Sequence, residues 1–369
     1  MANIIDSNSV EYHLKKIVID GIIFALQRAG GISSIWADIL LELDQHYCKK
    51  YKISLLLPKN KNVEWARVES EIHNISIIPR RHFRWDRRSF FIESLYLSRL
   101  ALKLRADGWH SSYYVGFPLF PKTKRLLMFH DMIPEKTKIG ENLYLSRAKK
   151  VALTNSDIVH TISHSALRDL QEFYPHLKAK TEVIHNFQRT HKKQIEQAPL
   201  PFPYFLYVGK RGGYKNFISC FKHLLEDPEF NPIHIVTVGD DPWTLEEKQI
   251  IDRFDASKRV HNLGIVETEK LHALIQHTLL LLYPSLYEGF GLPVLEAFQH
   301  NVPILACNTS SIPEVAGSTY PLCNPNEPST FTEVIHELLK NRKKWAEYGK
   351  NRLDLFSVKR TVEQICALW

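Results

Sequence analysis

The stretch PSLYEGFGLPVLEAFQHNVPILACNTSSIPEVAG, residues 284–317, is the most informative part of this chain. Two carboxylates, Glu288 and Glu296, lie eight positions apart, and the loop between them runs into Pro293. Proline is favoured at the first position of a helix, so we expect Glu288 on a loop and Glu296 about one turn into the following helix. Unpaired amides at the start of that helix predict a phosphate site, and the carboxylates predict hydrogen bonds from sugar hydroxyls.

Small residues in the same stretch support this interpretation. Gly289 and Gly291 allow the backbone to approach a ligand closely. Asn301 stands where we expect the helix to end, because asparagine tolerates the left-handed conformation. The stretch is therefore typical of a pocket for a sugar attached to a phosphate.

The composition is that of a globular protein with two domains. A length of 369 residues exceeds that of most single domains, and 44% of the residues are hydrophobic. The chain contains no apolar stretch long enough for a transmembrane helix and no pattern of a signal peptide. Its five cysteines are scattered without a Cys-x-x-Cys pair, which argues against zinc or a disulfide framework. These features predict a cytoplasmic location with reduced thiols.

A net charge of +8 predicts an anionic partner. The positive charge is concentrated in residues 79–91, PRRHFRWDRRSFF, where five arginines are interleaved with aromatic side chains. This mixture favours peripheral contact with the surface of an anionic membrane. The alternative is a solvated loop that is rich in arginine. Nucleic acid is not expected as a partner, because no known binding motif accompanies the charge.

Short apolar runs alternate with longer helical patterns along the whole chain, which predicts βα units around parallel sheets. A helix is expected after the turn at Gly30 and Gly31, and another over 166–173, where Ser163 and Ser165 can cap it. The predicted strands are 16–19, 53–57, 75–78, 108–110, 125–129, 158–161, 182–184, 204–208, 233–238, 260–263, 279–283 and 304–306.

A break in the pattern predicts the domain boundary. Residues 191–203 lack periodicity and end in a proline-rich run, so we interpret them as a linker between domains at 1–190 and 204–355. The last segment, 356–369, has apolar residues at helical spacing.

The run SLYEGFGLPVLEA, followed by a helix, a strand and SSIPEVAG, resembles the C-terminal fingerprint of retaining glycosyltransferases of family 4, including its Glu-x7-Glu pair. The resemblance covers nearly the whole chain and is strongest over 204–317. It implies an α/β GT-B fold, in which two doubly wound Rossmann-like domains face each other across a cleft. It further implies that the first domain binds the acceptor and the second the nucleotide sugar. In this family the final helix commonly crosses back onto the N-terminal domain.

The loop YVGKRGGYKNF, residues 207–217, supplies candidate cations. Fixed positive charges stabilise a nucleotide diphosphate as it leaves. The resemblance implies that Arg211 and Lys215 hold this diphosphate, with Gly209 in the binding loop. The arginine stands one position later than in many members of the family. The alternative is an ordinary basic turn.

The resemblance also implies roles for the carboxylates and amides of the opening stretch. Glu288 is expected to bind hydroxyls of the transferred sugar, and Glu296 those of the ribose. The amides of Phe290, Gly291 and Leu292 are expected to face the sugar and its phosphates. The alternative for Glu296 is an exposed helix acid.

Three further positions complete the expected site. The backbone of Ile265 and Val266 resembles the segment that contacts the nucleotide base. Gly30 and Gly31 resemble the loop that covers the phosphates, although such a pair also makes ordinary turns. His130 follows a predicted strand and is expected near the donor sugar; the alternative is a buried structural histidine.

We expect neither a metal nor a cofactor. The adjacent Asp240 and Asp241 do not form the Asp-x-Asp pair typical of metal-dependent sugar transferases. They fit a turn after a strand instead. With fixed cations and a helix N-terminus present, no divalent ion is needed for the diphosphate.

The sequence therefore predicts a retaining hexosyltransferase that acts in surface polysaccharide or lipopolysaccharide synthesis. Mannose from GDP-mannose is the first choice of donor, followed by UDP-sugars, and the acceptor is a glycan or a lipid-linked saccharide. Two alternatives remain open, namely a non-hydrolysing nucleotide-sugar epimerase of similar fold and a catalytically silent homologue that binds nucleotide sugars.

Overall fold

A computed structural model describes residues 14–27, 30–80, 87–114, 122–138, 143–189, 197–239, 242–327 and 329–369. Contacts divide the chain into two compact units. The first comprises the described residues up to Leu127, together with Arg147–Ile158 and Leu368–Trp369. The second comprises Met128–Ser146 and Val159–Ala367.

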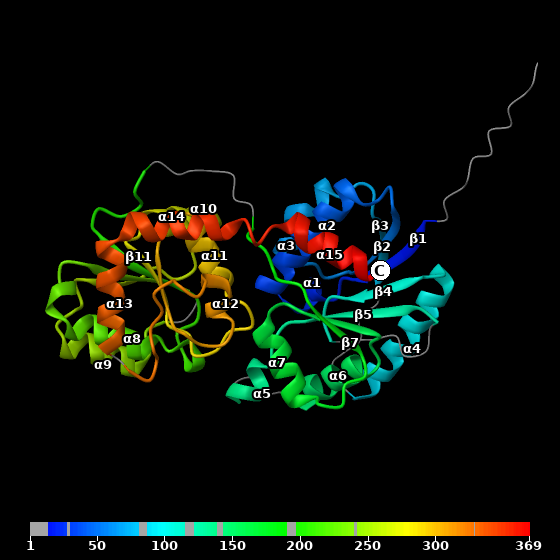
Figure 1. The fold of residues 1–369 in the computed structure, drawn as a ribbon, viewed down its shortest axis with the longest axis horizontal. Helices are drawn as coiled ribbons and strands as arrows, with labels where there is room; N and C mark the ends of the chain where they lie inside the picture. The colour runs from blue at the N-terminus through cyan, green and yellow to red at the C-terminus, as the bar shows by residue number, and fades with distance from the viewer. Residues whose placement is uncertain are drawn as a thin grey trace, which may run out of the picture. The chain divides into compact units, whose positions relative to one another are not determined.

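A seven-stranded sheet forms from the first half of the chain (Figure 1). Its strands are β1 (Lys15–Asp20), β2 (Tyr51–Pro58), β3 (Ser76–Arg80), β4 (Gly108–Ser111), β5 (Lys124–Phe129), β6 (Ile158–Thr161) and β7 (Lys180–Val183). Their order is β3-β2-β1-β4-β5-β6-β7. β1 pairs in parallel with β2 and β4, as does β2 with β3 and β4 with β5. Parallel neighbours in this order need a crossover connection between strands, and among the described residues helices supply these connections except the one between β4 and β5.

These helices alternate with the strands. They are α1 (Ile23–Leu26), α2 (Gly31–His46), α3 (Val63–Val68), α4 (Arg87–Leu104), α5 (Ile133–Thr137), α6 (Leu143–Thr154) and α7 (His164–Phe173). The predicted Ser163 cap is confirmed, because the Ser163 hydroxyl accepts a hydrogen bond from the amide of Ala166 at 2.9 Å.

A five-stranded sheet forms from the second half in the order β10-β9-β8-β11-β12. Its strands are β8 (Tyr204–Val208), β9 (His234–Val238), β10 (Val260–Asn262), β11 (Leu280–Tyr283) and β12 (Ile304–Ala306), and all their pairings are parallel. Each strand lies within two residues of its predicted range, as do those of the first sheet. The α/β expectation of two doubly wound domains is confirmed.

A second set of helices surrounds this sheet (Figure 1). They are α8 (Phe217–Glu226), α9 (Leu245–Arg253), α10 (Thr268–His277), α11 (Leu292–Gln299), α12 (Ile312–Ala316), α13 (Ser329–Lys340) and α14 (Arg342–Leu353). The last helix of the chain is α15 (Val358–Leu368). Asn301 has the left-handed backbone expected after α11, with φ of +56°. Near the end of the chain, the hydroxyl of Thr361 donates to the His185 carbonyl at 2.8 Å, which ties α15 to the segment after β7.

One residue of the basic segment 79–91 corrects a prediction. Arg80 is 1% exposed, so it cannot belong to a surface that meets a membrane. Its guanidinium lies 3.0 Å from Asp20 and 2.7 Å from Glu93, and both carboxylates are buried with it. The charge is kept inside the unit because two acids neutralise it there.

Other predictions fall on residues outside the described part of the chain. The structure does not describe residues 81–86 of the basic segment, the aspartates Asp240 and Asp241, or residues 191–196 of the expected linker. The boundaries expected at 190 and 203 stay a prediction. Among the described residues, no helix has both the length and the hydropathy that crossing a membrane requires.

Candidate functional site

The loop that carries Glu288 connects β11 to α11 and is held by two serines. The backbone amide of Glu288 donates to the Ser310 hydroxyl at 2.8 Å, and the hydroxyl of Ser311 donates to the Glu288 carbonyl at 2.9 Å. Ser311 also donates to the carbonyl of Phe290 at 2.7 Å. These contacts fix the loop on both sides of Gly289, so the Glu288 side chain projects from a rigid support.

Lys215 and Glu288 form an ion pair, which brings together two of the residues predicted from sequence. Lys215 Nζ lies 2.7 Å from Glu288 Oε1, and the two side chains are only 22% and 10% exposed. Tyr283, at the end of β11, shares a side-chain hydrogen bond with Glu288. Burial first, and then the negative charge of Glu288, raise the pKa of Tyr283 well above its ordinary value. Tyr283 therefore stays protonated and can donate to the carboxylate.

The helix that follows this loop begins as the sequence predicted. α11 starts at Leu292 with Pro293 in its first turn. Gly291 caps it with φ of +112°, a conformation that favours glycine. The first backbone amides of the helix and its positive dipole end thus lie beside Glu288, where an anion would be stabilised.

Gly289 is required by a close approach within the chain. A Cβ at this position would lie 2.6 Å from the His130 carbonyl oxygen and 2.9 Å from Asp131 Cβ. The backbone of His130, which follows β5 and is 3% exposed, thus packs against the loop next to Glu288. The structure therefore places the main chain of His130 against Gly289, next to Glu288, and the expected position of His130 near the donor sugar stays a prediction.

Glu296 lies in α11 and is partly buried. Burial raises the pKa of its carboxyl, and the positive charge of Arg189 partly offsets this effect. His300 follows Glu296 by four residues. The charge of Arg189 also acts on His272, whose pKa is lowered first by burial and then by this arginine. The rings of His272 and His300 are joined by a contact of 3.1 Å between Nδ1 and Nε2. Glu296 thus has a basic neighbour that the sequence did not identify.

Arg211, expected to hold the diphosphate, is buried against an acid, and its expected role stays a prediction. Its Nε lies 2.8 Å from Glu247 Oε1, its Nη2 donates to the Pro242 carbonyl at 2.7 Å, and its guanidinium stacks 4.6 Å from the Trp243 ring. Arg211 is 3% exposed and Glu247 is 1% exposed. Glu247 also forms the capping box of α9 with Thr244. These contacts join the β8–α8 loop to the start of α9.

The predicted base-binding segment lies at the carboxyl ends of β8, β9 and β10. The Gly209 amide donates to Val238 at 2.8 Å, and the Gly239 amide donates to Gly264 at 3.0 Å. Gly209 has φ of +115°, and a Cβ on Gly239 would lie 2.7 Å from the Gly209 carbonyl oxygen. Three turns thus pack backbone against backbone at the edge of the sheet where α/β proteins bind ligands.

The remaining predicted positions are found in two places. Ile265 is 72% exposed and Val266 is partly buried, both directly after Gly264. Gly30 and Gly31 lie in the first unit, where Gly31 starts α2 and the Gly30 carbonyl accepts from the hydroxyls of two serines at 3.0 Å. Within the second unit, no interaction among the described residues joins Ile265, Val266 or Glu296 to Glu288.

A second support of the Glu288 loop was not expected from sequence. The hydroxyl of Tyr287 donates to the carboxylate of Asp169, which is also 2.5 Å from Lys136 Nζ. The Ser163 hydroxyl donates to the Gly289 carbonyl at 2.7 Å. The only sequence signal for this arrangement was the Ser163 cap, because Asp169 and Tyr287 are 118 positions apart.

Two family models match this chain. The model described as Glycosyltransferase Family 4 matches residues 29–191, and the model described as Glycosyl transferases group 1 matches residues 188–352. The two matches meet near residue 190, and together they take in most of the chain.

Named relatives match shorter segments. O-antigen chain mannosyltransferase B from Escherichia coli is 30% identical over 156 residues, which make up 40% of this chain and 40% of that protein. O-antigen chain mannosyltransferase RfbU from Salmonella typhimurium is 24% identical over 199 residues, 54% of this chain and 55% of that protein. The matches thus span between 40% and 55% of the length of these relatives.

Solved structures of the same fold cover almost the entire chain. Sucrose-phosphate synthase from Thermosynechococcus elongatus has a TM-score of 0.72 and 16% identity over 96% of this chain and 98% of that chain. The Anabaena protein Alr3699/HepE, solved in complex with UDP and glucose, has a TM-score of 0.67 and 16% identity over 96% and 99%. These likenesses show that the predicted GT-B fold is present.

Proposed function

Because this chain belongs to glycosyltransferase family 4, we propose that it transfers a hexose, with mannose as the first choice, from a nucleotide diphosphate sugar to a glycan or lipid-linked saccharide acceptor. The observation that carries the proposal is the Lys215–Glu288 pair beside the first amides of α11. Relatives named O-antigen chain mannosyltransferases support mannose and a role in surface polysaccharide synthesis. Neither an epimerase nor a silent homologue is favoured by these relatives.

In this proposal Lys215 and the α11 amides hold the diphosphate. As the bond from the sugar C1 to the phosphate oxygen breaks, negative charge grows on that oxygen, and a fixed cation stabilises it where it forms. Lys215 is already held in place by Glu288 and lies 5.1 Å from the Tyr214 ring and 5.6 Å from the Tyr283 ring. Little side-chain entropy is therefore lost when a phosphate becomes its second partner.

Glu288 and Glu296 would then bind the two hydroxyl-bearing parts of the donor. Glu288 has a second carboxylate oxygen besides the one that faces Lys215, and this oxygen can accept from the sugar. Glu296 would accept from the ribose hydroxyls. We assign Arg211 a structural role in this scheme, because its guanidinium is committed to Glu247 and to the Pro242 carbonyl.

We further propose that the transfer retains the configuration of C1. The acceptor oxygen bonds to C1 on the same face from which the phosphate oxygen leaves, and the acceptor proton passes to that phosphate oxygen. In this scheme the charge of the leaving group is compensated by Lys215 and by backbone amides. Transfer is accordingly expected to persist in the presence of a chelator, with no divalent ion added.

A donor panel tests the function directly. The purified chain is heated with GDP-mannose, UDP-glucose, UDP-N-acetylglucosamine or the free nucleotides, and the stabilisation by each is measured. A true donor at a hundredfold excess over its dissociation constant adds about 2.7 kcal/mol to the free energy of unfolding. Absence of stabilisation by every nucleotide sugar would contradict the proposal. The strongest donor is then used, as a labelled sugar, to follow transfer to membrane extracts or oligosaccharides and to determine the product anomer.

Matched variants separate the proposed site from general damage. Glu288→Gln should abolish most transfer while the protein stays folded. The exposed pair Lys222–Glu246, with 3.4 Å between its charged atoms, supplies the controls Lys222→Met and Glu246→Gln. Equal losses in Glu288→Gln and Glu246→Gln would reject Glu288 as a site residue.

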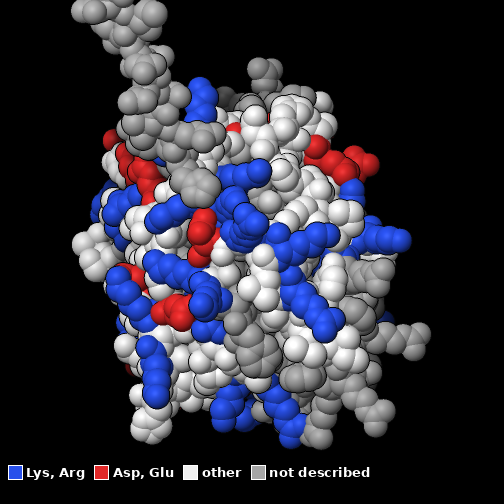
Figure 2. Space-filling view, turned by 90° about the vertical axis from the view of Figure 1, so that its right-hand side faces the viewer, with Lys and Arg blue, Asp and Glu red and all other residues white. Residues whose placement is uncertain are grey.

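Peripheral contact with an anionic membrane is part of the proposal. Figure 2 shows Lys and Arg in clear excess over Asp and Glu on the side that carries β1, β4 and α4 in Figure 1. The α4 helix adds exposed apolar side chains, with Ile92 51% and Leu102 61% exposed. The exposed cations of this region are Lys15, Lys52, Arg99, Lys103, Arg105 and Lys124. Basic and apolar groups together suit the interface of an anionic bilayer.

Vesicle sedimentation tests this contact. Binding to vesicles with phosphatidylglycerol should exceed binding to phosphatidylcholine vesicles and should fall as salt rises. The double variant Arg99→Gln with Lys103→Gln should bind less tightly, whereas Lys222→Gln should not differ from wild type. Equal binding to both kinds of vesicle would count against the contact.

A further inference from the structure

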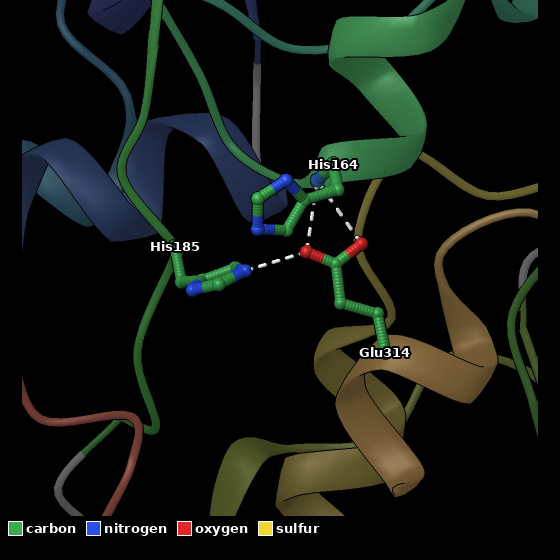
Figure 3. Close-up of side chains that lie close together, drawn as sticks. All are labelled: His164, His185 and Glu314. Atoms are coloured by element: carbon green, nitrogen blue, oxygen red, sulfur yellow. Dashed lines mark hydrogen bonds and ion pairs between the residues drawn. The ribbon is translucent and has the colours of Figure 1, made fainter. Parts of the chain in front are cut away.

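Two histidines and a carboxylate from three separate elements converge in the second unit (Figure 3). His164 is the first residue of α7, His185 lies in the segment after β7, and Glu314 lies in α12. One ring nitrogen from each histidine and one carboxylate oxygen all lie within 4.8 Å of one another. Among the described residues, this is the one group of three such side chains with that spacing.

We propose that His164, His185 and Glu314 bind a zinc ion. Imidazole nitrogen and carboxylate oxygen are ordinary zinc ligands, at about 2.0–2.2 Å from the metal. Three protein ligands leave a fourth position for water, and the exposed side of His164 provides access from solvent. The proposal goes beyond sugar transfer, and the zinc ion has no part in the proposed transfer step.

The carboxylate is already oriented by backbone amides. The His164 amide lies 2.8 Å and 3.0 Å from the two Glu314 oxygens, and the Ser165 amide lies 3.3 Å from one of them. Burial acts to raise the pKa of the Glu314 carboxyl, but its hydrogen bond to His185 and then its bonds to the amides of His164 and Ser165 lower this pKa below its ordinary value. A ligand that is fixed by hydrogen bonds from outside the site binds metal more tightly than a mobile one.

His185 is oriented by its own surroundings. Its carbonyl accepts from the Thr361 hydroxyl at 2.8 Å, and its ring lies against Phe290 at 6.2 Å and Phe356 at 5.7 Å between centroids. Its Nε2 lies 2.5 Å from Glu314 Oε1. Figure 3 draws this contact as a dashed line. A proton occupies this gap when no metal is bound.

Zinc would take the place of that proton. Two ligand atoms of a tetrahedral zinc ion are about 3.4 Å apart, given bond lengths near 2.1 Å. The His185–Glu314 pair must therefore widen by roughly an ångström, and His164 must turn inward by a similar amount. His164 can turn at little cost, because its side chain is exposed at the start of a helix.

Two other histidine contacts in the chain lack this combination. His234 and His261 are 2.9 Å apart, and His272 and His300 are 3.1 Å apart. Among the described residues, no carboxylate oxygen lies within 4.8 Å of the ring nitrogens of both histidines in either pair. They therefore serve as internal controls for a zinc experiment.

Calorimetric titration of the chelator-treated full chain with zinc alone tests the proposal. Wild type should bind one zinc ion at this site, and His164→Ala should bind it at least about tenfold less tightly. His164→Ala keeps the backbone amide that holds Glu314, so the variant is expected to fold. His176→Ala, an exposed histidine outside the cluster, and His234→Gln should leave the affinity unchanged.

Cobalt provides a second readout that does not depend on enzymatic activity. The Co²⁺-loaded wild type should show the visible absorption of a four-coordinate ion, and Glu314→Gln and His164→Ala should lose it. Equal zinc affinity in wild type and His164→Ala would overturn the proposal. So would a loss of zinc binding in His234→Gln that is as large as the loss in His164→Ala.

Discussion

Lys215 and Glu288 form a 2.7 Å ion pair across two loops that follow neighbouring parallel strands. β8 and β11 lie side by side in the second sheet, so the loops at their carboxyl ends meet although 73 positions separate the two residues. This edge is where open α/β sheets place their ligands. The pair therefore links the order of the strands to the chemistry of the proposed site.

Lys215→Met should lower the rate of sugar transfer by about 10²-fold, because a fixed charge that stabilises the leaving diphosphate is lost. Steady-state kinetics with the preferred donor measure this effect. The loss should appear mainly in kcat, since the charge on the phosphate grows in the transition state. Lys222→Met is the matched control on an exposed lysine, and a similar loss in that variant would refute the role of Lys215.

Arg211→Met should act on stability more than on catalysis. The change leaves Glu247 buried without its cation, and breaking a buried pair costs about 3–5 kcal/mol. Chemical denaturation measures the loss. The double variant Arg211→Met with Glu247→Gln should recover part of it, because no charge then remains buried without a partner. If the Arg211→Met protein is as stable as wild type but has no transfer activity, the structural role is wrong and Arg211 binds the diphosphate.

Glu296→Gln should stabilise the fold at neutral pH and weaken donor binding. Burial raises the pKa of this acid, so the folded state binds its proton more tightly than the unfolded state does. The free energy of unfolding therefore rises as pH falls through the folded pKa, and at neutral pH the ionised carboxylate is unfavourable. Glutamine removes that charge and this part of the pH dependence.

Thermal unfolding from pH 4 to 8 checks the stability change of the Glu296 variant, with Glu246→Gln as an exposed control. Donor affinity should fall about 10- to 100-fold if the ribose hydroxyls donate to this carboxylate. Unchanged donor affinity would remove Glu296 from the proposed site even if the stability prediction holds.

Asp169→Ala should slow transfer although Asp169 has no proposed contact with substrate. Its carboxylate accepts from Tyr287, which directly precedes Glu288. Loss of this support should misplace Glu288 and reduce kcat by about 10- to 100-fold. Tyr287→Phe should have a similar effect, and the double variant should be little worse than either single variant. Additive losses would show that the two residues act independently.

The strands and the loop positions were predictable because they depend on local patterns. Short apolar runs predicted β8 and β11, and the Gly-Phe-Gly-Leu-Pro run predicted the start of α11. A family resemblance singled out Lys215 and Glu288 as separate site residues, but the ion pair between them was seen only in the structure. Contacts between distant residues were not predictable in the same way, since no local pattern shows that Asp169 meets Tyr287.

Two buried arginines show what local sequence patterns do not reveal. Arg80 and Arg211 both stand in basic segments that indicate an anionic partner. In the fold, both are buried against acids from other elements, Arg80 against Asp20 and Glu93 and Arg211 against Glu247. The number of arginines in a segment does not reveal which of them an internal carboxylate neutralises.

Glu247 Oε2 accepts from the Thr244 amide at the start of α9, and both carboxylate oxygens of Glu247 accept from the guanidinium of Arg211. Unfolding the first turn of α9 must therefore also release Arg211, which lies in the β8–α8 loop four residues before Lys215. Amide hydrogens in these two segments should exchange with solvent in step, as members of one cooperative unit. The rate of sugar transfer and the local unfolding of this loop would then both depend on the cap of α9, a group with no proposed contact to the sugar.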